Sequence, residues 1–109
     1  MKRILFSAVG STDPIAGQHD GAILHIARNY DLDEIYLYLS KEMCELDEKD
    51  DRYCYCLEKL KEDTGKSFHI HKICRPELTE VHIFDFFMEE FRKIIDQILR
   101  ENECDLYLN

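Results

Sequence analysis

The sequence has no long hydrophobic run: no stretch approaches the ~20 consecutive apolar residues that a membrane-spanning helix needs. It has no signal peptide pattern either, because the basic pair Lys2-Arg3 leads into a short apolar run that reaches Gly10 without a small-residue cleavage site. Internal repeats and low-complexity segments are also absent. We therefore expect a cytoplasmic protein that has no membrane partner.

Basic side chains are in the minority, with 14 Lys and Arg against 23 Asp and Glu, which gives a formal net charge of −9. A field of this sign repels a bulk polyanion, so general DNA or RNA binding by this domain is disfavoured. A small phosphate-bearing ligand is not excluded, because such a site works locally through backbone donors.

The cysteine pattern predicts neither disulfides nor a metal site. There are five cysteines, an odd number, in a chain with no secretory context, so reduced thiols are expected. Cys54 and Cys56 lie two apart on a predicted helix and therefore diverge. His69 and His71 share one face of a predicted strand while Cys74 points to the other, and no zinc-type spacing completes the set.

Common catalytic and cofactor motifs are missing. The sequence has no G-x-G-x-x-G fingerprint, no G-x-x-x-x-G-K-S/T phosphate loop and no G-x-S-x-G elbow. Asp13 and Asp20 are the only candidate carboxylate pair that we single out, and an Asp-Pro turn and a helix cap at Asp20 explain both. The 109 residues therefore show no catalytic centre and imply no cofactor or metal, and whether the chain is an enzyme stays open.

Hydrophobic residues make up 45% of the chain, which is typical of one globular domain of 109 residues. Their pattern alternates strands with helices, β-α-β-α-β-α-β, which predicts an α/β fold with a parallel sheet and right-handed crossovers. We expect a Rossmann-like three-layer sandwich with the strand order 3-2-1-4. The predicted strands span 2–9, 34–39, 67–74 and 105–108, and the predicted helices span 18–30, 41–63 and 83–102.

A polar turn, Gly10 to Pro14, follows the first predicted strand, and ligands of parallel sheets bind at the carboxyl ends of strands. Gly10 permits a sharp turn or a close backbone approach to a ligand. The hydroxyls of Ser11 and Thr12 and the free N–H groups near a helix start suit a phosphate. Lys41 follows the second strand and points at the same crevice. On spacing alone, a tight turn that binds nothing explains the pattern equally well.

Three segments carry a resemblance to a known family: AVGSTDPI at residues 8–15, DGAILHIARNY at 20–30 and YLYLSKEM at 36–43. Together, in this order, they resemble the amino-terminal sensor domain of the type III CRISPR ancillary ribonucleases, the CRISPR-associated Rossmann-fold (CARF) domain. The resemblance is strongest over residues 4–43 and looser through Asn109. In the full-length relatives a HEPN ribonuclease domain follows.

The resemblance implies a function in antiviral defence. The ligand it implies is a cyclic tetra- or hexa-adenylate, which lies across the two-fold axis of a sensor homodimer and activates the ribonuclease. Carried over by motif, the ligand-binding residues are Gly10, Ser11, Thr12, Asp13 and Asn109, with Lys41 added by geometry. The alternatives are a metal-independent ring nuclease that degrades this ligand, and a dimerisation remnant that does not bind it.

In the resembled family a Gly- and Ser-containing loop and a helix follow the fourth strand, and that loop forms half of the ligand site. We therefore expect residues 1–109 to be a CARF-type domain that is incomplete at its carboxyl end, with the HEPN domain absent. An engineered truncation, a proteolytic fragment or a broken reading frame would each produce it.

Overall fold

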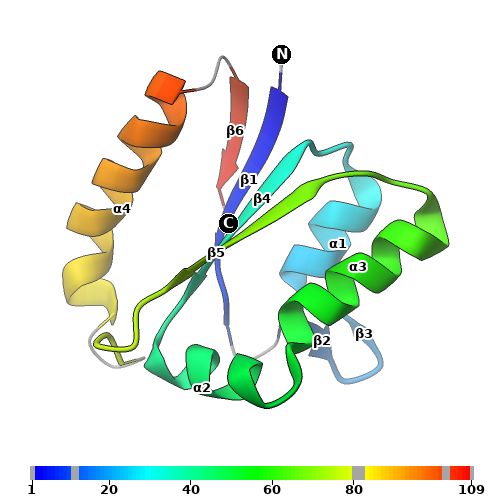
Figure 1. The fold of residues 1–109 in the computed structure, drawn as a ribbon, viewed down its shortest axis with the longest axis horizontal. Helices are drawn as coiled ribbons and strands as arrows, with labels where there is room; N and C mark the ends of the chain where they lie inside the picture. Colours follow the sequence, from blue (N-terminus) through cyan, green and yellow to red (C-terminus); the bar gives the residue numbers. More distant parts are fainter. Residues whose placement is uncertain (1, 11–12, 80–82, 102–103, 109) are drawn as a thin grey trace.

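A sheet of four parallel strands forms the centre of the protein (Figure 1). The computed structural model describes residues 2–10, 13–79, 83–101 and 104–108, and for residues 83–88 and 104 it describes the backbone only. Its strand order is β5-β4-β1-β6, which confirms the predicted order 3-2-1-4 and the Rossmann-like α/β class. The strands are β1 (Lys2–Ala8), β4 (Glu34–Leu39), β5 (His69–Cys74) and β6 (Cys104–Leu108).

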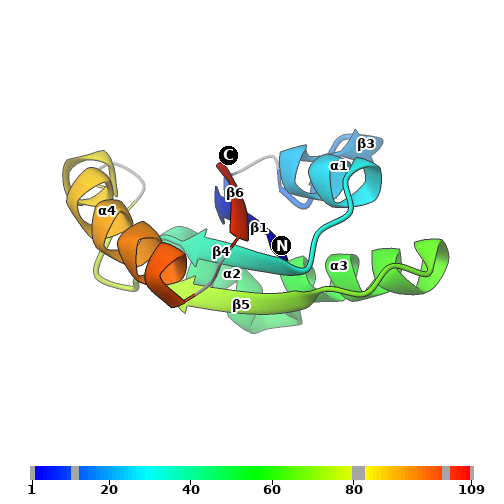
Figure 2. The same cartoon turned by 90° about the horizontal axis from the view of Figure 1, so that it is seen from above.

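Helices cover both faces of this sheet, as Figure 2 shows: α4 (Ile83–Glu101) lies on one face, and α1 (Ala22–Asn29) and α3 (Arg52–Thr64) lie on the other. The near-continuous apolar run of β1 fits this three-layer arrangement, because a strand buried on both faces needs apolar side chains on both. Leu5 belongs to the core with α1 and α3, while Ile4 and Phe6 belong to the core with α4. None of the described helices has the length and apolarity to cross a bilayer.

The first helix begins later than the sequence pattern predicts. Instead of a helix from Gln18, residues 15–20 form a small hairpin of β2 (Ile15–Ala16) and β3 (His19–Asp20), with Gly17 at a positive φ of 66° in its turn. The helix α1 starts at Ala22, and its N-cap, Gly21, makes no side-chain capping bond. The predicted cap at Asp20 is therefore wrong: its carboxylate accepts a hydrogen bond from Arg28 at 2.8 Å.

The predicted helix over residues 41–63 is two helices, α2 (Lys41–Asp50) and α3. The chain breaks at Asp51, whose φ of 51° and ψ of 34° are left-handed, a conformation that aspartate tolerates better than most residues. The charged run at residues 47–52 predicts a solvated stretch, and this prediction is wrong for Asp47, which is only 8% exposed. Gly65 ends α3 with a φ of 72°, as its position in the sequence predicts.

Candidate functional site

The carboxyl ends of β1 and β4 lie side by side, so the segments that follow them begin at the same edge of the sheet. Ala8 pairs in register with Tyr38, and the next residue, Val9, donates its N–H to the Tyr38 carbonyl at 2.9 Å. Of the six predicted ligand residues, the structure describes three, Gly10, Asp13 and Lys41, and brings all three to this edge. The other three, Ser11, Thr12 and Asn109, lie outside the described residues.

The carboxylate of Asp13 organises the loop after β1. Its Oδ2 accepts the N–H of Gly10 at 2.9 Å, and its Oδ1 accepts the N–H of Ile23, in the first turn of α1, at 3.4 Å. A negative charge at this position also interacts favourably with the positive end of the helix dipole. Asp13 therefore ties the loop to α1 and occupies two N–H groups that a phosphate would otherwise use. The sequence predicts an Asp-Pro turn at Asp13 but not its hydrogen bond to the first turn of α1.

Gly10 is not required by the conformation of its own turn. Its φ is not among the positive values that the described glycines show at Gly17 and Gly65. A Cβ at this position would meet only Oδ2 of Asp13, at 3.7 Å, which is an ordinary contact. The sharp-turn explanation for Gly10 is therefore wrong for this conformation, and close approach of a ligand stays a prediction.

Lys41 has a fixed backbone and an exposed side chain. It is the first residue of α2, and its N–H donates to the Leu78 carbonyl at 2.7 Å. The preceding residue, Ser40, is buried and caps the helix, its Oγ accepting the Met43 N–H at 3.4 Å. The positive charge of Lys41 is thus carried on a rigid helix start, next to the loop that Asp13 holds.

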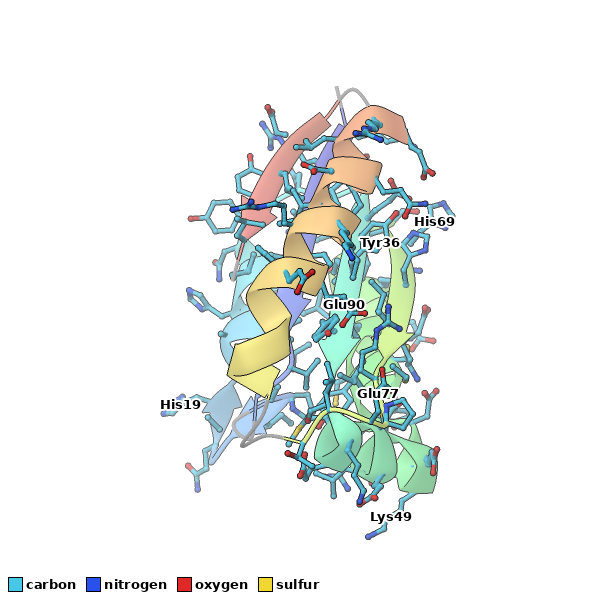
Figure 3. All side chains as sticks on the ribbon, turned by 90° about the vertical axis from the view of Figure 1, so that its left-hand side faces the viewer. His19, Tyr36, Lys49, His69, Glu77 and Glu90 are labelled. Carbon is cyan, nitrogen blue, oxygen red and sulfur yellow. The ribbon has the colours of Figure 1, made fainter. Side chains whose placement is uncertain are left out.

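A partly buried polar cluster that the sequence did not predict links α4 to this edge. The hydroxyl of Tyr38, which has no exposed surface, donates to Oε2 of Glu90 at 2.6 Å. Arg75, the first residue after β5, donates through Nε to the other oxygen of the same carboxylate. Glu90 lies where α4 crosses the sheet, as seen in Figure 3. The alternation of β4 favours a buried Tyr38, but no local signal points to a partner 52 residues away.

The ionisation of this cluster follows from its contacts. Burial and then the hydrogen bond to Glu90 raise the pKa of Tyr38, so that the phenol stays neutral. Burial by itself raises the pKa of Glu90, but the hydrogen bonds from Tyr38 and Arg75 outweigh it and lower the pKa below its usual value. The cluster is therefore an anionic carboxylate held by one cation and one neutral donor.

Two surface pockets are poor candidates for a phosphate ligand. The first, of about 410 Å³, lies between α4 and the loop after β5, and its charged lining consists of Glu77, Glu89, Glu90 and one cation, Lys93. Three carboxylates against one ammonium group repel an anion. This pocket therefore does not extend the candidate phosphate site.

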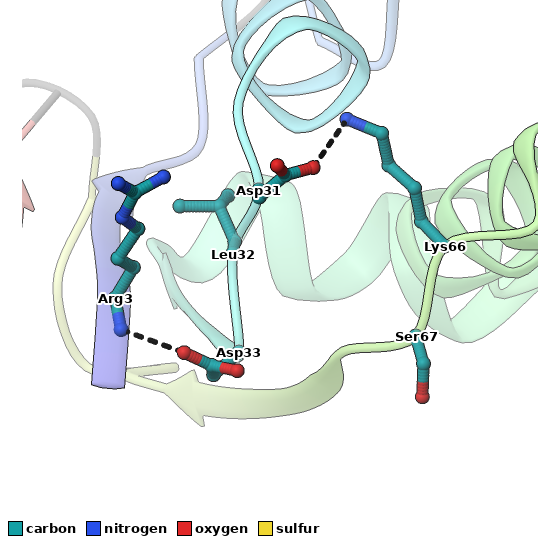
Figure 4. Close-up of a pocket in the computed structure, with 6 residues that line it drawn as sticks. All are labelled: Arg3, Asp31, Leu32, Asp33, Lys66 and Ser67. Carbon is teal, nitrogen blue, oxygen red and sulfur yellow. Dashed lines mark hydrogen bonds and ion pairs between the residues drawn. The ribbon is translucent and has the colours of Figure 1, made fainter. Parts of the chain in front are cut away.

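The second pocket, of about 350 Å³, lies at the opposite edge, where β1 and β4 begin (Figure 4). It is lined by Arg3, Asp31, Leu32, Asp33, Lys66 and Ser67. Its two cations, Arg3 and Lys66, are balanced by Asp31 and Asp33. Nζ of Lys66 is also already engaged, because it donates to the carbonyls of Ala27, Arg28 and Tyr30 at 3.2, 2.8 and 3.0 Å. Lys66 thus satisfies the carboxyl end of α1, which is a structural role.

Among the residues that the structure describes, no group of three or more His, Cys, Asp or Glu side chains is placed to hold a metal ion. The imidazole of His71 instead stacks on Tyr36 with ring centroids 4.3 Å apart, and its Nε2 lies 3.0 Å from Oε1 of Glu34.

The relatives of the chain are CRISPR endoribonucleases, although no protein-family model matches it. It is 35% identical over 98 residues to the CRISPR system endoribonuclease Csm6 of Mycobacterium tuberculosis, covering 90% of the chain and 22% of the relative. It is 32% identical over 108 residues to Csm6′ of Streptococcus thermophilus, covering 98% and 27%. Over 41 residues, 38% of the chain and 10% of the relative, identity to Csm6 of Streptococcus thermophilus reaches 63%.

The fold also matches a solved structure, that of Enterococcus italicus Csm6 bound to cyclic hexa-2′-fluoro-hexa-dAMP. The TM-score is 0.79 at 25% sequence identity, and the match covers 100% of this chain and 26% of that one. The chain thus spans about a quarter of the length of these proteins. The resemblance to the type III CRISPR ancillary ribonucleases is confirmed: the chain is homologous to one domain-sized part of the Csm6 CRISPR endoribonucleases.

Proposed function

We propose that this domain binds a cyclic oligoadenylate at the carboxyl edge of its sheet and acts as the sensor of a type III CRISPR ribonuclease. The observation that carries the proposal is the match of the whole chain to a relative whose structure holds a cyclic hexa-adenylate analogue. The polar loop and Lys41 lie at the edge where parallel sheets bind ligands, which agrees with this proposal.

The proposed contacts follow from the chemistry of the edge. A ring of adenylates presents repeated phosphate anions, and the exposed ammonium group of Lys41 is a charge-assisted donor for one of them. Gly10 has no side chain to keep a phosphate or ribose away from its backbone, while Ser11, Thr12 and Asn109 supply further donors in our proposal. Asp13 acts by holding the loop in place rather than by donating to the ligand.

We propose further that two copies of the domain share one ring. A ring of four or six identical adenylates can have two-fold symmetry, which matches the symmetry of a homodimer with equivalent loops on either side. Binding would favour the dimer conformation for which the ring has the higher affinity, and a ribonuclease domain joined to the sensor would respond to that shift.

A calorimetric titration of the 109-residue chain tests the proposal, with cyclic hexa-adenylate and cyclic tetra-adenylate as ligands and linear hexa-adenylate as the reference. We expect at least one ring to bind more tightly than the linear form. Lys41→Ala should weaken binding about 10-fold, because one hydrogen bond to a charged group is lost. Lys49→Ala, which removes an exposed lysine from the same helix, is the matched control and should leave affinity unchanged.

The same experiment separates the alternatives. Absence of heat with either ring would support a dimerisation remnant and contradict the sensor proposal. Mass spectrometry of the recovered ligand distinguishes a sensor, which returns the ring intact, from a ring nuclease, which returns linear products.

A further inference from the structure

Two thiols from different elements meet at the end of β4. Cys74 is the last residue of β5 and lies directly opposite Leu39 in the parallel ladder. Cys44, in α2, directs its Sγ at the carbonyl oxygen of the same Leu39, at 3.5 Å. Both sulfur-bearing residues thus border one backbone position, although they are 30 residues apart in the chain.

A neighbouring contact shows that the face of β5 that carries Cys74 is turned toward α2. Cys74 and Lys72 are two residues apart on β5 and so share a face of the sheet. Nζ of Lys72 reaches Oδ2 of Asp47 in α2 at 2.6 Å, and Asp47 lies about one helical turn beyond Cys44. Because α2 starts at the carboxyl edge, Cys44 and Cys74 are the members of their elements nearer that edge. Their thiols also interact with each other, since the neighbouring Cys74 thiol contributes, after burial, to the raised pKa of Cys44.

We propose that Cys44 and Cys74 form a redox pair that a hydroperoxide converts into a disulfide joining α2 to β5. In the first step the Cys74 thiolate attacks one peroxide oxygen and becomes a sulfenic acid. The O–O bond breaks, and the other oxygen leaves as hydroxide or alkoxide, which takes the proton that the Cys74 thiol released to solvent and becomes water or an alcohol. In the second, Sγ of Cys44 attacks the Cys74 sulfur, and the sulfenic oxygen leaves as water with the Cys44 proton. Sulfur loses two electrons, and the peroxide gains them.

The exposures of the two thiols assign their order of reaction. Cys74 is exposed and accessible to an oxidant, whereas Cys44 is 5% exposed. Burial, reinforced by the adjacent Cys74 thiol, raises the pKa of Cys44 to about 12, which keeps it a poor primary target. Cys54 and Cys56 also have pKa values raised by burial, and their spacing on α3 directs them apart.

Peptide mapping of the full chain under non-reducing conditions tests this pair after limited treatment with hydrogen peroxide. We expect a cross-linked peptide joining Cys44 to Cys74, which is lost on reduction with dithiothreitol. Cys74→Ser and Cys44→Ala should each abolish it, and Cys54→Ser, the matched control on α3, should retain it. The oxidised chain should melt roughly 5 °C or more higher, because the bond restricts the unfolded chain.

Two outcomes would overturn the proposal. One is oxidation of Cys74 to sulfinic or sulfonic acid with no cross-link to Cys44. The other is a set of cross-links in which Cys44 pairs with the remaining cysteines as often as with Cys74. Both readouts are masses of the protein alone, so they are independent of whether the domain binds a cyclic oligoadenylate.

Discussion

At the scale of single residues, the buried aspartate of α2 depends on one lysine. Asp47 is 8% exposed, and Lys72 donates to its carboxylate at 2.6 Å and to that of Asp51, at the α2–α3 break, at 2.5 Å. Burial opposes the charge of Lys72, but the hydrogen bonds to the two aspartates outweigh it and raise the lysine pKa. Lys72 therefore neutralises a buried anion and holds the junction between two helices.

Replacing Lys72 by methionine should lower the free energy of unfolding by about 2 kcal/mol, because it leaves the Asp47 carboxylate buried without its cation. Urea denaturation followed by circular dichroism measures the loss. Lys49→Met removes an exposed lysine from α2 and should change the stability by less than about 0.5 kcal/mol. If the two substitutions lowered the free energy of unfolding equally, the contacts of Lys72 with Asp47 and Asp51 would not contribute to stability.

The sequence predicts the position of a single residue when that position depends on neighbours in the chain, and not when it depends on a partner far along the chain. The hydrophobic pattern predicts the position of Gly10 and Lys41 at the sheet edge, because it shows where a strand ends, while their ligand-binding role stays a prediction. The roles of Asp13 and Asp47 were not predictable in the same way. Their partners, the N–H of Ile23 and the ammonium of Lys72, are 10 and 25 residues away and become neighbours only through folding.

At the scale of elements, the sequence predicts the four strands of the sheet and their order. It does not predict the β2–β3 hairpin before α1 or the break between α2 and α3. A hairpin of two-residue strands, β2 and β3, is too short to show any period. The break at Asp51 is hidden because apolar residues continue at helical spacing across it, from Leu46 to Tyr53 and Leu57. The break is marked only by the left-handed backbone of Asp51, and the presence of an aspartate in the sequence does not reveal that conformation.

The docking of α4 provides a prediction at this scale, because Glu90 joins the helix to β4 and to the residue after β5. Glu90→Gln should lower the free energy of unfolding by about 1 kcal/mol at neutral pH, through loss of the charged contacts with Tyr38 and Arg75. The folded-state pKa of Glu90 is lowered, so its contribution is complete above the unfolded value and is lost as the pH falls through the folded one.

The stability difference between wild type and Glu90→Gln should therefore shrink between about pH 5 and about pH 3. Thermal denaturation across this range measures it. Glu89→Gln is the matched control, since the neighbouring carboxylate is 82% exposed and lies 4.0 Å from Lys93. A difference that grows in acid would contradict the assignment of Glu90 as an ionised partner.

At the scale of the whole molecule, the net charge of −9 opposes the homodimer that we propose. Two copies repel each other at low ionic strength, and raising the salt from about 0.1 M to about 1 M shortens the Debye length from about 10 Å to about 3 Å. The same salt weakens attraction between Lys41 and a phosphate. Self-association and ligand binding should consequently respond to salt in opposite directions.

Analytical ultracentrifugation and calorimetry, run on the same samples, test this opposition. We expect the dimer dissociation constant to fall severalfold over this salt range, while the affinity for the cyclic ring decreases, because screening removes repulsion in one case and attraction in the other. Dimers that dissociate as salt rises would instead indicate an interface held by ion pairs between copies. If no dimer formed at any salt concentration, with or without the ring, two loops could not share one ligand, and the symmetric part of the proposal would fail.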